Sequence, residues 1–146
     1  KYVIKGGRNG QESIRNGVFE LEKHFSHDDL VIIHDAIRPM VSADIITDNI
    51  RVAQQYGNAV TVIPCAEAML VTEDAIGSEE SYPRDSLKRT QTPQAFHIGE
   101  ICELHRKAIE AGITNSVASC TLMVEMGKRV YFSSGSENST SMVSGI

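Results

Sequence analysis

An aspartate and an arginine directly follow an apolar run in this sequence. Residues 31–34 (Val-Ile-Ile-His) lead into Asp35, and Arg38 and Pro39 come three and four residues later. Such a run is typical of a strand buried on both faces of a parallel sheet, and it must end before Pro39, which has no N–H to donate. Asp35 and Arg38 are therefore expected at the carboxyl end of a central strand, where open α/β sheets bind ligands.

These two residue types at a strand end suit phosphoryl or nucleotidyl transfer. A carboxylate can hold a divalent metal ion, and a guanidinium can bind a phosphate through two parallel hydrogen bonds. Asp35 and Arg38 are the candidates for these roles. The pattern is equally compatible with a surface ion pair at a strand-to-turn junction, because paired charges are only probabilistic markers of a site.

The elements that must position this pair alternate between strand and helix patterns. Val and Ile runs mark the strands, and apolar residues at spacings of three and four mark the helices. Ser42 is a suitable N-cap for one of these helices, and Gly57 a suitable end. This alternation of strands and helices predicts an α/β fold with a mostly parallel sheet. Strands are expected at residues 1–5, 30–34, 59–64 and 128–133, and helices at 11–25, 42–56, 97–111 and 116–126.

One segment departs from this alternation of strands and helices. Residues 65–90 combine a strand-like stretch at 68–72, a polar acidic run and a possible returning strand at 86–90. This order predicts a hairpin that projects from the sheet, for which a solvated surface role is the default. In the helix at 97–111, His105 lies near the border of the apolar face and is expected to be structural or solvated.

Composition excludes several classes of protein. The chain has 146 residues, 41% of them hydrophobic, and a net charge of −5 without a basic tract, which favours one domain and argues against nucleic-acid binding. No apolar run is long enough to span a bilayer and no signal-peptide pattern occurs, so a cytoplasmic location and no membrane partner are expected. The three cysteines lack CxxC spacing, which favours reduced thiols over a disulfide or zinc site.

The sequence resembles the 2-C-methyl-D-erythritol 4-phosphate cytidylyltransferase family, which includes relatives that act on ribitol 5-phosphate. Residues 34–39 (His-Asp-Ala-Ile-Arg-Pro) match its HDAxRP motif, and residues 92–96 (Thr-Pro-Gln-Ala-Phe) match TPQxF. Residues 6–14 resemble GGxxRxxSV, with Gly10 at the arginine position. The resemblance implies a Rossmann-like three-layer nucleotidyltransferase fold with a projecting β-arm at residues 65–90.

The activity implied by this resemblance is transfer of CMP from CTP to 2-C-methyl-D-erythritol 4-phosphate, with release of pyrophosphate, in non-mevalonate isoprenoid biosynthesis. Ribitol 5-phosphate, for CDP-ribitol in cell-wall or capsule synthesis, is the alternative acceptor. Ala68 stands where the family has a threonine that is expected to help hold methylerythritol phosphate, so both acceptors remain open. A generic dinucleotide-binding dehydrogenase is disfavoured, because no GxGxxG motif follows a strand.

The same resemblance implies roles for individual residues. Asp35 would ligate Mg²⁺, and Arg38 would bind the acceptor phosphate together with Thr92. Arg84 would reach this phosphate from the arm of a second subunit in a homodimer. Gly7 and Ser13 are expected to contact the cytosine base. The residues expected around the nucleotide and substrate are Gly7, Arg8, Ser13 and Thr114.

Members of this family begin with a strand, a Gly- and Arg-containing loop that wraps the triphosphate, and a lysine, and carry another lysine near the C-terminus. We therefore expect this sequence to be a fragment truncated at both ends. Residues 1–134 would form a partial nucleotidyltransferase domain, and residues 135–146 a Ser-rich disordered tail. A catalytically poor chain is expected, and the competing class is an inactive dimerising fragment.

Overall fold

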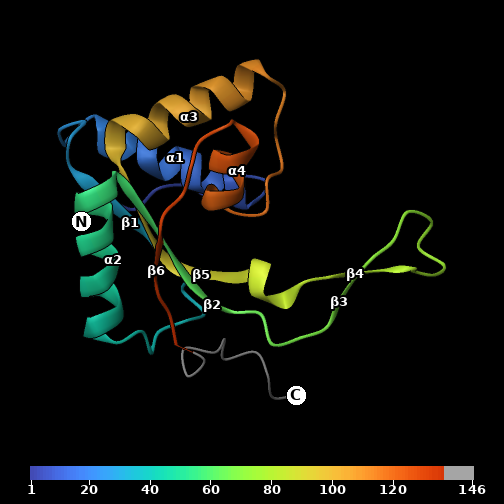
Figure 1. Ribbon diagram of the computed structural model, residues 1–146. Helices are drawn as coiled ribbons and strands as arrows, with labels where there is room; N and C mark the ends of the chain where they lie inside the picture. The colour runs from blue at the N-terminus through green and yellow to red at the C-terminus, as the bar shows by residue number, and fades with distance from the viewer. Residues whose placement is uncertain (137–146) are drawn as a thin grey trace.

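A four-stranded mixed sheet lies at the centre of the protein, in a computed structural model that describes residues 1–136 (Figure 1). Strand β5 pairs antiparallel with β1 on one side and β2 on the other, and β2 pairs parallel with β6. The predicted α/β class is therefore confirmed. Three strands share one direction, and β5 runs against them. The order across the sheet is β1 (Leu30–Ile33), β5 (Lys88–His97), β2 (Asn58–Pro64) and β6 (Phe132–Ser134).

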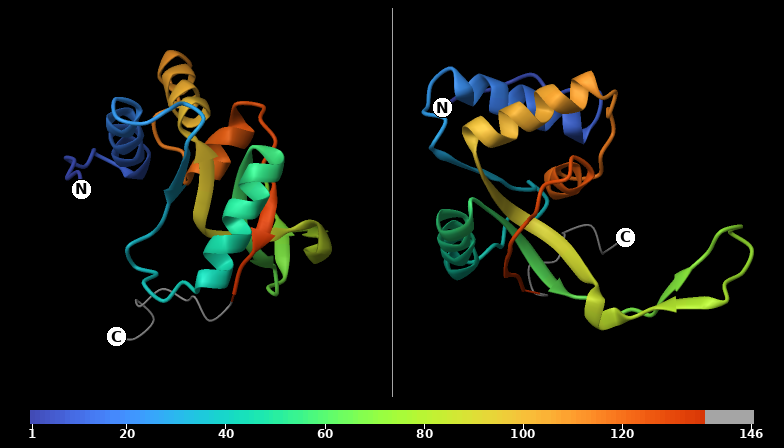
Figure 2. Two further views of the ribbon diagram at one scale, coloured as in Figure 1. Left: turned by 90° about the vertical axis from the view of Figure 1, so that its left-hand side faces the viewer. Right: turned by 45° about the horizontal axis from the view of Figure 1, so that its top comes forward.

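Helices cover both faces of this sheet and give the three layers. Ala95 and Phe96 are neighbours on β5, so their side chains point to opposite faces. Phe96 belongs to the larger core, which includes side chains of three helices, whereas Ala95 packs with Val52 and Ala53 of the fourth. The two groups lie on opposite sides of the sheet in Figure 2. The first group contains α1 (Gly10–Glu22), α3 (Ile98–Glu110) and α4 (Ser119–Glu125), and the second is α2 (Ala43–Tyr56).

The predicted boundaries of α2 are confirmed at both ends. The Ser42 side chain caps the helix by accepting a hydrogen bond from the Ile45 N–H at 3.4 Å. Gly57 ends it with a φ of 100°, a left-handed conformation that glycine adopts without strain. No helix in residues 1–136 is long and apolar enough to cross a membrane.

Several predicted elements are wrong. Residues 1–5 form no strand. Within residues 1–136 only β5 pairs with β1, so β1 lies at an edge of the sheet there, and Ile32 is 37% exposed. The prediction of a central strand buried on both faces therefore fails. Helix α1 stops at Glu22, three residues before its predicted end, and Phe25 beyond it is half exposed. Helix α4 begins at Ser119, three residues later than predicted, and Val117 before it is exposed.

The TPQxF segment, residues 92–96, lies within the central strand β5, where no strand was predicted. Val60 of β2 faces Gln94, and the next residue, Thr61, faces Gln91, so Thr92 and Pro93 form a bulge on β5. A bulge is one of the few places where a proline fits inside a sheet, because it has no N–H to pair. The Thr92–Pro93 peptide bond is cis.

The predicted hairpin projects from one end of the sheet as an arm of residues 65–87 (Figures 1 and 2). Its strands are β3 (Met69–Val71) and β4 (Glu80–Tyr82), which pair antiparallel. A short 3₁₀ helix, Arg84–Ser86, joins the arm to β5. The predicted returning strand at 86–90 is wrong, because β5 begins at Lys88 and pairs there with β2.

Asn49 ties α2 to the sheet from a position with no solvent exposure. Its Nδ2 lies 2.8 Å from the Ser133 Oγ and 3.1 Å from the Pro93 carbonyl, which belong to β6 and β5. It also lies 3.3 Å from the Thr61 Oγ1 on β2, and that hydroxyl donates to the Pro93 carbonyl at 2.6 Å. One amide therefore links three strands beneath α2.

We expect Asn49→Ala to lower the free energy of unfolding by about 2–4 kcal/mol, because it leaves buried polar groups unpaired on three strands. Urea denaturation of the 146-residue chain would measure this. Gln54→Ala, an exposed amide on the same helix, is the matched control and should change stability by less than about 0.5 kcal/mol. Equal effects of the two substitutions would contradict the proposed role of Asn49.

Candidate functional site

The Asp35–Arg38 turn follows β1 and holds the two predicted charged residues side by side. The Arg38 N–H donates to the Asp35 carbonyl at 3.0 Å, and the Arg38 Nε lies 3.3 Å from the Asp35 Oδ2. The His34 ring contacts the Arg38 carbonyl through its Nε2 at 2.8 Å, a structural role. The Asp35 side chain is half exposed and the Arg38 side chain 21% exposed. Both charges can therefore reach a ligand.

Thr92 connects this turn to the central strand. Its Oγ1 accepts a hydrogen bond from the Asp35 N–H at 3.1 Å, although the two residues are 57 positions apart. Thr92 is 9% exposed and sits in the bulge of β5. The structure thus brings together Asp35, Arg38 and Thr92, three of the residues expected to act on the phosphates.

The other predicted nucleotide-contact residues gather at the first turn of α1. The Gly7 N–H donates to the Ser13 Oγ at 2.9 Å, and that hydroxyl donates to the Asn9 carbonyl at 3.0 Å. The Arg8 backbone N–H and side-chain Nε both donate to the Glu12 carboxylate at 3.0 Å, which lowers the pKa of Glu12. A Cβ on Gly7 would lie 2.4 Å from Glu12, so this position has room only for glycine.

Thr114 lies beside the same helix end. The Asn9 side chain donates to the Thr114 carbonyl at 2.8 Å, and Gln11 donates to the Ile113 carbonyl at 2.7 Å. The Gln11 side chain also accepts a hydrogen bond from the Ser116 N–H at 2.6 Å. These bonds hold the segment at 113–116 against α1. A hollow of about 300 Å³ lies here; Arg8, Asn9, Gln11, Glu12, Arg15 and Thr114 line it. Gly7, Arg8, Ser13 and Thr114 are thus close neighbours.

Arg84 belongs to a different region. It lies in the 3₁₀ helix at the base of the arm, and its Nη1 donates to the Ala66 carbonyl at 3.2 Å. Figure 1 shows this short helix where the arm meets β5, well away from α1. The structure therefore does not place Arg84 with the residues at the start of α1.

A cavity of about 140 Å³ adjoins Asp35 and was not predicted from sequence. His105 on α3 lines it and is 1% exposed, in contrast to the predicted position at the border of the apolar face. Burial lowers the pKa of His105 to about 4, so the ring is neutral near pH 7. The spacing from Ile101 and Ala108, four and three residues away, was a sequence signal for burial, because such positions share one helix face.

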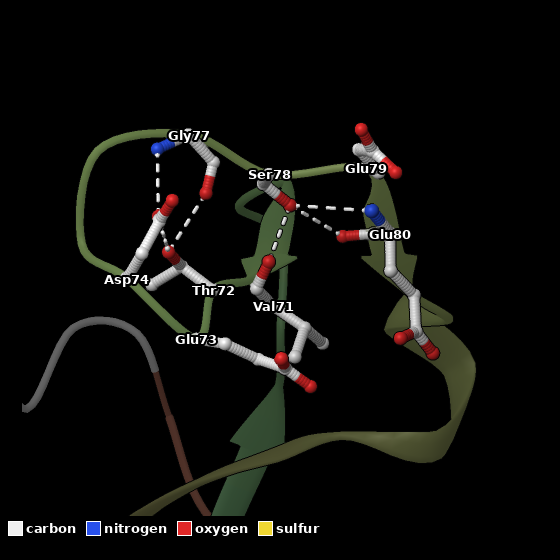
Figure 3. Close-up of a pocket in the computed structure, with 8 residues that line it drawn as sticks. All are labelled: Val71, Thr72, Glu73, Asp74, Gly77, Ser78, Glu79 and Glu80. Atoms are coloured by element: carbon white, nitrogen blue, oxygen red, sulfur yellow. Dashed lines mark hydrogen bonds between the residues drawn. The ribbon is translucent and has the colours of Figure 1, made fainter.

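Another hollow, with a volume of about 590 Å³, lies on the loop between β3 and β4 (Figure 3). Asp74 Oδ1 accepts from the backbone N–H groups of Ile76 and Gly77, which lowers the pKa of Asp74. Thr72 Oγ1 donates to the Gly77 carbonyl at 2.7 Å. These polar groups satisfy one another and shape the loop, so we regard this acidic hollow as a turn structure.

An α/β sheet that presents an acidic residue and an arginine just beyond a strand end is typical of nucleotide-binding domains. The chain belongs to the IspD family, 2-C-methyl-D-erythritol 4-phosphate cytidylyltransferase, whose family model matches residues 1–143. The resemblance seen in the sequence motifs is therefore confirmed.

The individual relatives fall into two groups, which are named for different acceptors. Ribitol-5-phosphate cytidylyltransferases of Vibrio parahaemolyticus and Lacticaseibacillus paracasei are each 37% identical over 94% of this chain. A 2-C-methyl-D-erythritol 4-phosphate cytidylyltransferase of Clostridium novyi is 32% identical over 94% of it. The chain spans only 58%, 59% and 57% of the lengths of these relatives.

Solved structures agree with the fold. The 2-C-methyl-D-erythritol 4-phosphate cytidylyltransferase of Thermus thermophilus is 27% identical and superimposes with a TM-score of 0.77, over 95% of this chain and 65% of that one. The 4-diphosphocytidyl-2C-methyl-D-erythritol synthase of Anaerococcus prevotii has a TM-score of 0.83 at 21% identity, over 99% and 64% of the two chains. At 21% identity, the similarity to the Anaerococcus prevotii structure supports only the shared fold.

The burial of His105 predicts a pH dependence of stability. The folded ring has a pKa of about 4, whereas histidine in an unfolded chain protonates near pH 6.5. The unfolded state binds the extra proton, so this contribution is complete above pH 6.5 and is lost as the pH falls toward 4. Between pH 7.5 and 5.0 we expect a loss of about 2 kcal/mol in the free energy of unfolding.

Urea denaturation of the wild type and of His105→Leu at the two pH values would measure this difference. The variant should lack the loss assigned to His105. His27→Leu removes a mostly exposed histidine and should keep the wild-type dependence. An unchanged dependence in His105→Leu would show that another group is responsible.

Proposed function

We propose that the protein is a cytidylyltransferase that transfers CMP from CTP to a sugar-alcohol phosphate. The observation that carries this proposal is the Asp35–Arg38 pair, held beyond β1 by Thr92, in a chain of this family. In the reaction, an oxygen of the acceptor phosphate forms a bond to the α-phosphorus of CTP. The bond from that phosphorus to the bridging oxygen breaks, and pyrophosphate leaves.

The chain's own residues contribute positioning and charge neutralisation, the main components of catalysis in such transfers. The Arg38 guanidinium binds the acceptor phosphate and disperses its charge. The Thr92 hydroxyl already accepts from the Asp35 N–H, and its own hydrogen remains a donor for a phosphate oxygen. Thr92 therefore fixes the Asp35 turn and contacts the substrate with the same atom.

The metal proposed for this site is Mg²⁺, with Asp35 as its protein ligand. Within residues 1–136 no group of three or more His, Cys, Asp or Glu side chains could hold a metal ion. A single carboxylate still fits, because Mg²⁺ is commonly bound by one or two carboxylates together with substrate phosphates. The Asp35 carboxylate is half exposed and thus accessible. When bound, the ion supplies neutralisation of phosphate charge.

The nucleotide is proposed to lie against the start of α1. The Gly7 backbone and the Ser13 hydroxyl would face the cytosine base, with Arg8 and Thr114 beside it. The hydrogen bonds that hold Gly7, Ser13 and Thr114 around Asn9 support this placement. The hollow of about 300 Å³ at this point provides space.

We favour ribitol 5-phosphate as the acceptor. The two ribitol relatives are 37% identical to this chain, against 32% for the methylerythritol relative from Clostridium novyi. Ala68 also replaces a threonine expected to help hold methylerythritol phosphate. 2-C-methyl-D-erythritol 4-phosphate is the second candidate, supported by the family model.

The arm is proposed to join two subunits, with Arg84 completing the phosphate site of the partner. A two-stranded hairpin is only marginally stable on its own. The arm nevertheless exposes apolar side chains: Met69 by 45%, Leu70 by 68%, Ile76 by 92% and Tyr82 by 49%. A second copy of the chain would cover them, and this favours the homodimer.

We expect Arg38→Ala to lower kcat/KM for ribitol 5-phosphate about a hundredfold, because a donor aimed at transition-state charge contributes roughly 3 kcal/mol. A pyrophosphate-release assay with CTP and Mg²⁺ would measure it. Arg51→Ala, an arginine exposed on α2, is the matched control and should keep wild-type values. If the wild type neither turns over nor binds CTP in calorimetry, the inactive dimerising fragment replaces this proposal.

We expect Leu70→Asp to shift the chain from dimer to monomer in sedimentation velocity, because it places a charge in the apolar contact of the arm. Gln54→Asp adds the same charge on exposed α2 and should leave the dimer intact. A wild-type chain that is monomeric at all accessible concentrations would refute the arm contact.

A further inference from the structure

The segment at residues 113–116, between α3 and α4, has no regular secondary structure. Gln11 of α1 fixes its backbone at two points. The side-chain Nε2 donates to the Ile113 carbonyl at 2.7 Å, and the Oε1 accepts from the Ser116 N–H at 2.6 Å. An amide suits this bridge, because it carries a donor and an acceptor at its two ends. Gln11 is 8% exposed, so water competes little for these bonds.

The same segment presents polar side chains to solvent. Thr114 and Asn115 are exposed, and neither side chain has a hydrogen-bond partner within residues 1–136. The Thr114 backbone is fixed nevertheless, because its carbonyl accepts from the Asn9 side chain at 2.8 Å. The two groups that Gln11 binds flank Thr114 in the sequence. The segment therefore combines a fixed backbone with side chains that are available to a ligand.

Gln11 lines two of the hollows described above. One is the hollow of about 300 Å³ against which the nucleotide is proposed to lie, and Thr114 lines it as well. The other is the cavity of about 140 Å³ beside Asp35, which Ser116 also lines. The segment held by Gln11 thus contributes to the walls of both. A shift of this segment would change the shape of the site on the nucleotide side and beside Asp35 together.

We propose that Gln11 is a positioning residue of the cytidylyl transfer, which holds Thr114 in place to contact CTP. This inference rests on the proposed function, because CTP is the ligand expected in the larger of the two hollows. Gln11 makes its own bonds to the protein backbone and acts on the ligand through Thr114. A loop that is fixed before the ligand arrives need not be ordered on binding, so the bonds of Gln11 contribute to the affinity for CTP.

A double-mutant cycle on the 146-residue chain would test this, with the Kd for CTP in the presence of Mg²⁺ measured by calorimetry. Thr114→Val should weaken the Kd about tenfold, because one hydrogen bond to the ligand is lost. Gln11→Met keeps the length of the side chain but neither bond, and should weaken the Kd by a similar factor. The double variant should be no weaker than Thr114→Val, because Gln11 acts through Thr114.

Pyrophosphate-release kinetics separate positioning from a loss of folding. Gln11→Met should raise the KM for CTP about tenfold and change kcat by less than about twofold, whereas a partly unfolded enzyme would lose kcat at unchanged KM. Gln54→Met makes the same substitution at an exposed position of α2 and is the matched control. This variant should keep the wild-type Kd and KM.

Additive losses, with the double variant about a hundredfold weaker than the wild type, would overturn the inference, as would a wild-type Kd in Gln11→Met. Both results leave the proposed function intact. The same cycle would be measured with ribitol 5-phosphate. Coupling with that ligand alone assigns Thr114 to the acceptor and overturns the contact with CTP. A wild-type chain that binds neither ligand overturns the inference and the proposed function together.

Discussion

The antiparallel pairing of β5 with both β1 and β2 is the constraint on which the remaining structure depends. β5 supplies Ala95 to one core and Phe96 to the other, so one strand organises both helical layers. Its bulge holds Thr92 against the Asp35 N–H and gives the Pro93 carbonyl to Asn49. Displacing this strand would therefore disturb the core, the attachment of α2 and the candidate site together.

The ionic interactions of the site serve positioning more than stability. The Asp35–Arg38 pair is partly exposed, and such pairs contribute only about 0–1 kcal/mol to folding. Around α1, Glu12 engages both Arg8 and Arg15, so those guanidinium groups are already oriented before a ligand arrives.

Local signals in the sequence predicted all four helices, although α1 ends three residues earlier and α4 begins three residues later than expected. The cap at Ser42 and the stop at Gly57 are dictated by residue chemistry close to the helix ends, so α2 was correct at both boundaries. The neighbourhood of Asp35, Arg38 and Thr92 followed from family motifs, because residues 57 positions apart carry no local signal for contact.

The errors come from pairing, which local patterns do not encode. A Val and Ile run predicts a strand but not its neighbours, so the edge position of β1 was missed. The strand at the TPQxF segment was missed as well, because the bulge that accommodates Pro93 depends on the register with β2. His105 was misjudged for another reason, because its spacing from Ile101 and Ala108 does mark the buried face of α3.

The edge position of β1 has a consequence for how the chain behaves in solution. No strand within residues 1–136 pairs with the second edge of β1, so a row of backbone N–H and C=O groups remains open. Such an edge is a template for another strand. Exposed Ile32 adds apolar surface to this strand. A charged or proline substitution in β1 would make the edge a poorer template for such pairing.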